Sequence, residues 1–137
     1  MAGNIRLEVV TPQKEVVKED AQIVVAPGML GEFGVLIGHT PFMTALNVGT
    51  LRYTDAQGQE RSVFVSGGFA EALPDKVTVL AESAERSQDI DVDRAKAAME
   101  RAQKRLEDKA ADIDYLRAEM ALKRALHRIQ LAESRHF

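Results

Sequence analysis

The sequence contains no cysteine and no tryptophan, and it has no glycine or proline from Asp75 onward. Without cysteine the chain can form neither disulfides nor thiolate metal sites, and it offers no cysteine nucleophile. Aromatic residues make up only 5% of the chain, so the core has to be built mainly from aliphatic side chains. Because glycine and proline interrupt regular helices, residues 1–74 are expected to turn often, whereas the rest can form long helices.

Charge and hydropathy limit the classes of partner. The formal net charge of −3 is mild and argues against nucleic-acid binding, which usually needs a strongly basic face. The apolar stretches are too short to span a bilayer, and no basic segment followed by an apolar one marks a signal peptide. We therefore expect a soluble cytoplasmic protein with no direct membrane insertion. The sequence from Tyr115 onward is basic, which favours an acidic partner or a phosphate.

Residues 1–86 are predicted to form an all-β domain. Ile5–Val10 alternates between apolar and polar residues, as a half-buried strand does. Residues 51–54 and 61–65 flank a glycine-bearing loop, a pattern typical of a hairpin. Many short strands separated by turn residues predict a β-sandwich or barrel. Further strands are expected at residues 22–26, 35–37 and 77–80.

Residues 27–41 form a region rich in glycine. No helix start follows these glycines, which argues against a nucleotide-binding loop. Met29, Leu30 and Phe33 lie beside turn residues, where they are either exposed for a protein contact or folded back into the core. His39 lacks partners for a metal site, so we assign it a structural or contact role. The enzymatic alternative is a small hydrolase that uses His39 with Glu32.

The segment Ser66-Gly67-Gly68-Phe69 resembles a nucleophile loop only superficially. It lacks the Gly-x-Ser-x-Gly spacing, and no strand–turn–helix pattern follows it. We therefore predict a turn between strands at this position.

Residues 87–137 are predicted to form an antiparallel two-helix hairpin. A pattern of alanines and arginines recurs at an offset of 23 residues. At roughly 100° per residue, each copy places its small and apolar residues in one stripe beside three arginines. Asp91 and Asp112 are plausible N-caps of the two helices. The stripes are Ala95, Ala98, Ala102 and Leu106 in the first copy, and Ala118, Ala121, Ala125 and Ile129 in the second.

The second helix also carries Leu116, Met120 and Leu131 on a further face. A helix that is apolar on two sides needs two neighbours. One is its partner helix, and the other is either the β domain or another protein.

The arginines allow two interpretations. They either form a solvated charged face or converge on an anion, because guanidinium groups match phosphate and carboxylate geometry. They are Arg94, Arg101 and Arg105 in the first helix, and Arg117, Arg124 and Arg128 in the second.

Along its whole length the chain resembles the epsilon subunit of bacterial F-type ATP synthases. The resemblance rests on the order of three signatures. The first is the glycine-rich stretch that ends in Gly38-His39-x-Pro41, and the second is Ser66-Gly67-Gly68-Phe69. The strongest is Ile90-Asp91-x-x-Arg94-Ala95, which opens the alanine- and arginine-rich hairpin.

This resemblance implies an α+β chain of two domains, an N-terminal β-sandwich over residues 1–86 and a C-terminal antiparallel two-helix hairpin over residues 87–137. It implies a non-catalytic rotor subunit on the central stalk that couples proton flow to rotation. The sandwich would contact the gamma subunit and the c-ring. The hairpin would extend toward the catalytic alpha and beta subunits to inhibit ATP hydrolysis. The complex would place the chain peripherally on the cytoplasmic face of the inner (plasma) membrane.

The resemblance also implies two sets of site residues. No cofactor is required, but ATP is a possible regulatory ligand of the folded hairpin. In the alternative, the chain couples rotation without physiological ATP sensing. The ATP-binding positions would be Glu85, Ile90, Asp91, Arg94, Ala95, Arg101, Arg124 and Arg128. The partner contacts would be Met29, Leu30, Glu32, Phe33 and His39. In the extended state, Arg124, Arg128 and Arg135 would meet acidic surface on the catalytic subunits.

Overall fold

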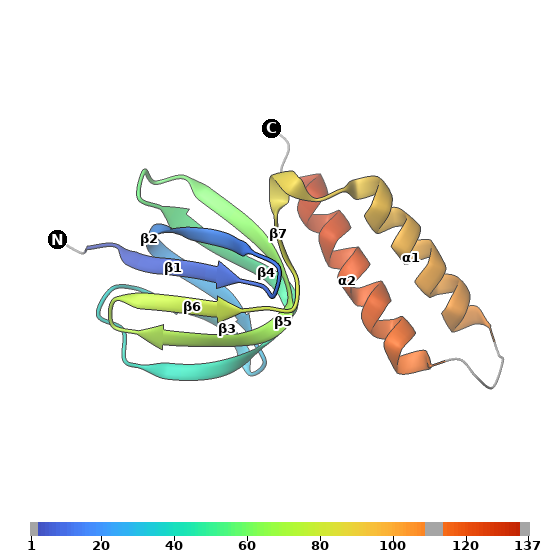
Figure 1. Ribbon diagram of the computed structural model, residues 1–137, viewed down its shortest axis with the longest axis horizontal. Coiled ribbons are helices and arrows are strands. Elements are labelled where there is room, and N and C mark those ends of the chain that lie inside the picture. Colours follow the sequence, from blue (N-terminus) through green and yellow to red (C-terminus); the bar gives the residue numbers. More distant parts are fainter. Residues whose placement is uncertain (1–2, 109–113, 135–137) are drawn as a thin grey trace. The chain divides into compact units, whose positions relative to one another are not determined.

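The computed structural model describes residues 3–108 and 114–134. The chain divides into two compact units, Met1–Arg86 and Ser87–Phe137. Strands make up the regular structure of the first unit, and two α-helices follow a short 3₁₀ turn in the second (Figure 1). The predicted fold class, a β-sandwich followed by a two-helix hairpin, is therefore confirmed.

Five strands of the first unit close into a ring of hydrogen-bonded neighbours. Their order is β1, β6, β5, β4 and β2, and an additional pairing of β1 with β2 closes the ring. The β1–β6 pair is parallel, and the other pairs of the ring are antiparallel. The five strands are β1 (Ile5–Val10), β2 (Glu15–Gly28), β4 (Phe42–Asp55), β5 (Glu60–Leu73) and β6 (Lys76–Leu80).

Two shorter strands extend this ring. β3 (Gly31–Val35) pairs with β2, and β7 (Ala84–Arg86) pairs with β5. The Arg86 side chain ties β7 to β2 as well, because its Nε donates to the Val16 carbonyl at 3.1 Å and its Nη2 lies 3.4 Å from Glu19. The final strand of the unit is thus held from two sides.

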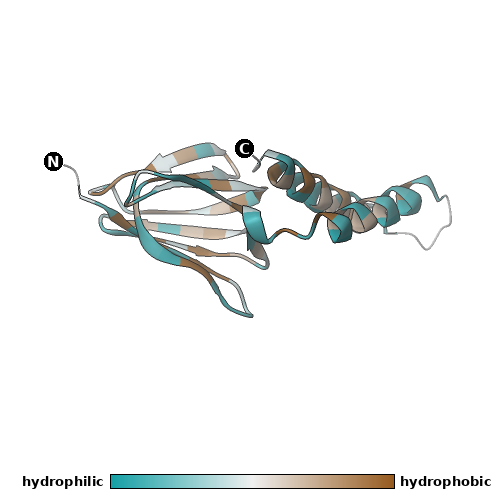
Figure 2. Cartoon of the chain, turned by 90° about the horizontal axis from the view of Figure 1, so that it is seen from above, coloured by the Kyte–Doolittle hydropathy of each residue, from teal (hydrophilic) through white to brown (hydrophobic). Residues whose placement is uncertain are grey.

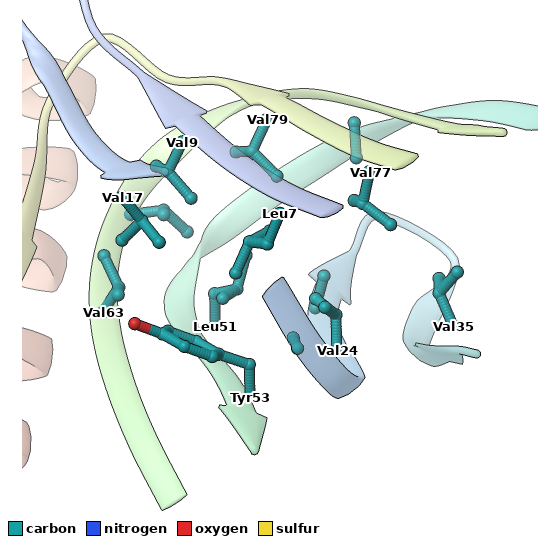
Figure 3. Close-up of a cluster of buried hydrophobic side chains, with 14 of the residues drawn as sticks. Leu7, Val9, Val17, Val24, Val35, Leu51, Tyr53, Val63, Val77 and Val79 are labelled. Atoms are coloured by element: carbon teal, nitrogen blue, oxygen red, sulfur yellow. The ribbon is translucent and has the colours of Figure 1, made fainter. Parts of the chain in front are cut away.

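The ring encloses an aliphatic core, as the low aromatic content requires. Burial alternates along β1, where Ile5, Leu7 and Val9 are fully buried, so the predicted half-buried strand is confirmed. Figure 2 shows hydrophobic and hydrophilic bands interspersed along the strands. Figure 3 shows how side chains from different strands meet in this core.

The β2–β3 hairpin corrects one expectation for the glycine-rich region. A strand was expected at residues 35–37, but β3 ends at Val35 and begins at Gly31. Gly28 pairs with Gly31, so the hairpin turns at Met29 and Leu30. Gly31 has φ +131°, which favours glycine. These glycines therefore shape a tight hairpin, which the sequence does not distinguish from an open loop.

The turn predicted at Ser66-Gly67-Gly68-Phe69 is wrong. These residues lie inside β5, which pairs with β7 up to Val65 and with β6 from Phe69 onward. Gly67 and Gly68 have φ of +105° and +121°, so β5 changes direction here without ending. A Cβ on Gly68 would overlap the Leu80 carbonyl oxygen. Glycine thus permits both the backbone conformation and the close approach of β6.

The second unit begins with a 3₁₀ turn, η1 (Ser87–Asp89), followed by α1 (Val92–Glu107) and α2 (Tyr115–Ser134). The two helices run antiparallel and pack together (Figure 1). Two alanines of each predicted stripe are buried: Ala95, Ala102, Ala118 and Ala125. The other four stripe residues, Ala98, Leu106, Ala121 and Ile129, are half-buried. The seam is therefore lined with small side chains, which let helix axes approach closely.

The N-cap predicted for α1 is confirmed, whereas the cap of α2 is a different aspartate from the one predicted. Asp91 caps α1, since its Oδ1 accepts a hydrogen bond from the Arg94 N–H at 3.0 Å. The cap of α2 is Asp114, whose Oδ1 accepts from the Arg117 N–H at 3.0 Å. The predicted cap Asp112 lies outside the described residues. Two aspartates stand two positions apart here, and only the register of the helix selects between them.

Candidate functional site

The start of α1 organises four of the residues predicted to bind ATP. Ile90 is buried just before the helix, and its N–H points to the Ser87 carbonyl at 3.4 Å. Asp91 follows as the N-cap and Ala95 is buried in the seam, whereas Arg94 projects into solvent. The motif thus combines an anchored helix start with an exposed guanidinium.

The arginines of the two helices differ in exposure. Arg94 and Arg101 are exposed on α1, about 10 Å apart along the helix axis at 1.5 Å per residue. Arg124 and Arg128 are half-buried on α2, one turn apart. Within the described ranges, Arg94, Arg101 and Arg124 form no ion pair with a carboxylate. Their charges are therefore available to an anion.

Antiparallel packing brings arginines from both helices to the same end of the hairpin. η1 contacts α2, so the start of α1 lies alongside the C-terminal half of α2. This arrangement puts Arg94 and Arg128 toward the same end of the hairpin, with Arg124 one turn before Arg128, near the middle of α2. Burial and, secondly, the charge of Lys123 lower the pKa of His127 below its ordinary value, which favours the neutral imidazole. The cationic groups of this region are therefore the guanidinium groups together with Lys123. Guanidinium groups bind phosphate well.

Glu85, the remaining residue predicted to bind ATP, belongs to the first unit. It lies in β7, opposite Phe64 of β5. The other seven predicted ATP-binding residues all belong to the second unit.

The five predicted partner-contact residues occupy the β2–β3 hairpin and the segment after it. Met29 and Leu30 form the tip, and Leu30 is completely exposed. Phe33 is half-buried against the Phe42 ring at 5.1 Å in an edge-on arrangement. The two alternatives for this region therefore each hold for part of it. The tip offers apolar side chains to solvent, and Phe33 packs inward.

Glu32 and His39 have separate surroundings. Glu32 Oε1 lies 2.8 Å from Arg52 Nη2. The His39 ring lies 4.9 Å from the Phe42 ring, and its Nδ1 contacts the Thr40 carbonyl oxygen at 2.5 Å. The geometry gives each residue a contact of its own and pairs neither with the other as acid and base.

Sequence reasoning missed an apolar face on β4, β5 and β6. Phe69 and Leu80 are directly opposed on β5 and β6, and each is 57% exposed. Met43 on β4 is also exposed, opposite Glu71. The available signal was the stretch after Gly68, which is apolar at positions facing both sides of the strand. A groove of about 450 Å³ borders this face, lined by Val10, Thr11, Pro12, Gly68, Phe69, Leu80, Ala81 and Glu82.

The described residues offer neither a metal cluster nor a membrane-spanning helix. Within residues 3–108 and 114–134, no three histidine, aspartate or glutamate side chains are grouped to hold a metal ion. In that same part of the chain, no helix is both long and apolar enough to cross a membrane.

Both units match known protein families. Residues 4–87 match the beta-sandwich domain of the ATP synthase delta/epsilon chain, and residues 88–133 match its long alpha-helix domain. An ATP synthase epsilon chain from Desulfatibacillum aliphaticivorans is 64% identical over 98% of this chain and 96% of its own length. The one from Desulforapulum autotrophicum is 62% identical over 98% of this chain and all of its own length.

Solved structures share the fold at low identity. A chain in the Euglena gracilis mitochondrial ATP synthase OSCP/F1/c-ring assembly matches 97% of this chain and 82% of its own length. Its TM-score is 0.79 at 23% identity. A chain of the Tetrahymena thermophila mitochondrial ATP synthase central stalk and c-ring has a TM-score of 0.57 at 13% identity, covering 97% of this chain and 96% of its own.

The protein thus belongs to the ATP synthase delta/epsilon family, and within it to the epsilon chains. Epsilon chains are non-catalytic subunits of the synthase. The small-hydrolase alternative built on His39 and Glu32 is therefore rejected.

Proposed function

We propose that this chain couples proton translocation to ATP synthesis as a central-stalk subunit, and that its helical hairpin restrains ATP hydrolysis. The observation that carries the proposal is the division into a ring-closed β unit with exposed apolar surface and a hairpin lined with arginines. The first suits permanent docking, and the second suits a charge-dependent, reversible contact. Structural neighbours in assemblies with F1 and c-ring support this assignment.

The β unit would provide two contact surfaces. The tip of the β2–β3 hairpin, Met29 and Leu30, would meet the c-ring. The apolar face at Met43, Phe69 and Leu80 would meet the gamma subunit. Exposed apolar clusters of this kind mark protein contacts. These contacts would hold the chain peripherally at the cytoplasmic face of the inner membrane, without insertion and without a role for nucleic acid.

Capture of the gamma subunit tests the apolar face. Phe69→Asp places a charge where an apolar contact is proposed, and it should reduce co-purification at least tenfold. Gln57→Asp, in the exposed turn between β4 and β5, adds the same charge elsewhere and should leave capture unchanged. Equal capture by the two variants would assign the gamma contact to another surface.

The hairpin would bind ATP through its grouped arginines. Arg94 and Arg128 toward one end of the hairpin, and Arg124 one turn further along α2, supply guanidinium groups with which triphosphate oxygens would replace solvent. Asp91 is engaged as the N-cap through Oδ1. A contact with the base would therefore compete with capping or use the second carboxylate oxygen. Bound ATP would bridge α1 and α2 and favour the folded hairpin over the extended, inhibitory state.

Calorimetric titration of the isolated chain with Mg-ATP and with ATP tests this site. Arg124→Ala should weaken binding roughly tenfold or more, since it removes charge-assisted hydrogen bonds. Arg117→Ala removes an equal charge from the opposite end of α2 and should bind as the unmodified chain does. Absence of binding at millimolar nucleotide would favour the alternative, a coupling subunit without ATP sensing.

A further inference from the structure

The end of α1 is not explained by its sequence. No glycine or proline occurs in residues 104–118, and residues 109–113 include lysine and two alanines, which favour helix. Yet α1 ends at Glu107, and α2 begins at Tyr115. Side-chain and backbone contacts at the two helix ends must therefore help to hold the reversal.

Three contacts fix these two ends. Asp108 has left helical geometry, with φ −75° and ψ 127°, while its N–H still donates to the Lys104 carbonyl. Asp114 caps α2 through the Arg117 N–H. The third contact joins the helices directly, because the Tyr115 hydroxyl donates to the Asp108 carbonyl oxygen at 2.7 Å. The first two contacts would survive if the helices separated, whereas the third requires the hairpin to be closed.

Tyr115 is placed for this bond more than for burial. It is 42% exposed, and the next residue, Leu116, is more exposed still. The carbonyl of Asp108 follows the last helical residue, so it is one of the acceptors that a helix C-terminus leaves without an intrahelical donor. The hydroxyl therefore satisfies an acceptor at the end of one helix from the first residue of the next.

We infer that the Tyr115–Asp108 hydrogen bond is a clasp that holds α1 and α2 as a closed hairpin and sets how readily the two helices separate. Its regulatory meaning rests on the proposed inhibition by the extended hairpin. A neutral bond that competes with water contributes little net free energy, so its loss should raise the open-to-closed ratio roughly two- to fivefold. A clasp of this strength biases a switch without locking it.

The absence of cysteine allows a direct test in the full-length chain. Lys96→Cys and Gln130→Cys introduce spin labels at exposed positions near the same end of the antiparallel pair. The distance between the two labels, measured by double electron–electron resonance at each urea concentration, reports the separation of the helices. The same titration is then repeated with Tyr115→Phe, which removes only the hydroxyl. Tyr53→Phe is the matched control, because it deletes the chain's other tyrosine hydroxyl from the β unit.

If this hydrogen bond holds the hairpin closed, the labels in Tyr115→Phe should separate at a lower urea concentration than in the unmodified chain. In Tyr53→Phe they should separate at the same concentration as in the unmodified chain. An identical separation midpoint in Tyr115→Phe and the unmodified chain would overturn the clasp. A second readout isolates the proposed function, namely ATP hydrolysis by a complex reconstituted with Tyr115→Phe. An earlier separation of the labels with unchanged hydrolysis would keep the clasp and contradict inhibition by the open hairpin.

Discussion

The two units bury different kinds of side chain. The fully buried core residues of the β unit include Ile5, Leu7 and Leu51, enclosed by a hydrogen-bonded ring. In the hairpin, the central seam between α1 and α2 is lined by alanines. A buried leucine contributes roughly 1.5–3 kcal/mol, and an alanine methyl much less. Hydrophobic stabilisation follows buried apolar area. We therefore expect a larger free energy of unfolding for the β unit than for the hairpin.

This difference matches the proposed division of work. A docking surface has to keep its shape through rotation, and the ring of strands provides that. A regulatory arm has to change its contacts for a small change in free energy, and an alanine seam allows that. Arginines on the arm then supply contacts that respond to charge.

The largest expected effect tests the rigidity of the β unit at Gly68. Gly68→Ala should destabilise this unit by roughly 3 kcal/mol or more, because it combines positive φ with overlap on the Leu80 carbonyl. Gly31→Ala shares the positive φ but meets nothing within 4 Å, so it should cost less. Urea unfolding followed by tyrosine fluorescence measures both. Equal losses would mean that backbone conformation, rather than the approach of β6, requires glycine at position 68.

Overfilling the seam should affect the hairpin alone. Ala125→Leu inserts three carbon atoms between closely packed helices and should cost about 1–3 kcal/mol of hairpin stability. Helical circular dichroism during urea titration measures it. Ala97→Leu, on the exposed side of α1, is the control and should change stability by less than about 0.5 kcal/mol. If Ala125→Leu and Ala97→Leu lost their helical signal at the same urea concentration, the seam would be loosely packed.

These two tests also show where sequence reasoning succeeds and where it fails. The alanine stripes and the Asp91 cap were predictable, because helical periodicity and capping are local. The role of Gly67 and Gly68 was not, since glycines in a turn and glycines where a long strand bends look the same in sequence. The strand that approaches them, β6, begins only after Pro74.

The placement of the candidate site residues was predictable to a similar extent. Spacing placed arginines on both helices, and the antiparallel fold puts Arg94 and Arg128 toward the same end of the hairpin. The exposure of Met29 and Leu30, against the inward packing of Phe33, depends on which two residues form the hairpin turn. The face at Phe69 and Leu80 depends on strand register, which no local pattern determines.

A smaller effect is expected in the pH dependence of β-unit stability, to which the Asp55 carboxylate contributes. Asp55 is buried, and the Arg61 side chain and then the Gln59 N–H lower the pKa of its carboxyl. A lowered pKa in the folded state gives stability that is present above about pH 4, the unfolded value, and is lost as pH falls through the folded pKa.

Asp55→Asn should therefore unfold at lower urea than the unmodified chain at pH 7, with the gap narrowing toward pH 3. Asp75→Asn, in the turn before β6, removes the same charge from an exposed site and serves as the control. A gap that stayed constant with pH would show that the Asp55–Arg61 pair, 2.8 Å apart, adds no stability that depends on ionisation.

The smallest effect concerns Tyr53, whose ring fills part of the β core (Figure 3). Burial and then the nearby Glu19 charge raise the pKa of its hydroxyl, whose geometry falls short of a hydrogen bond to any described residue. Tyr53→Phe removes a buried oxygen that forms no hydrogen bond to a described residue. The free energy of unfolding of the β unit should therefore stay within about 0.5 kcal/mol of that of the unmodified chain, or rise. A loss above 1 kcal/mol in urea unfolding would imply a hydrogen bond in solution, for which Glu19 is the nearest candidate.

The most direct test of the division of work is ATP hydrolysis by complexes assembled with the full chain or with residues 1–86 alone. We predict that both chains assemble to the same extent, because the proposed docking surfaces lie in the β unit. Hydrolysis should then be faster without the hairpin. Equal hydrolysis in equally assembled complexes would contradict the account, as would failure of residues 1–86 to assemble.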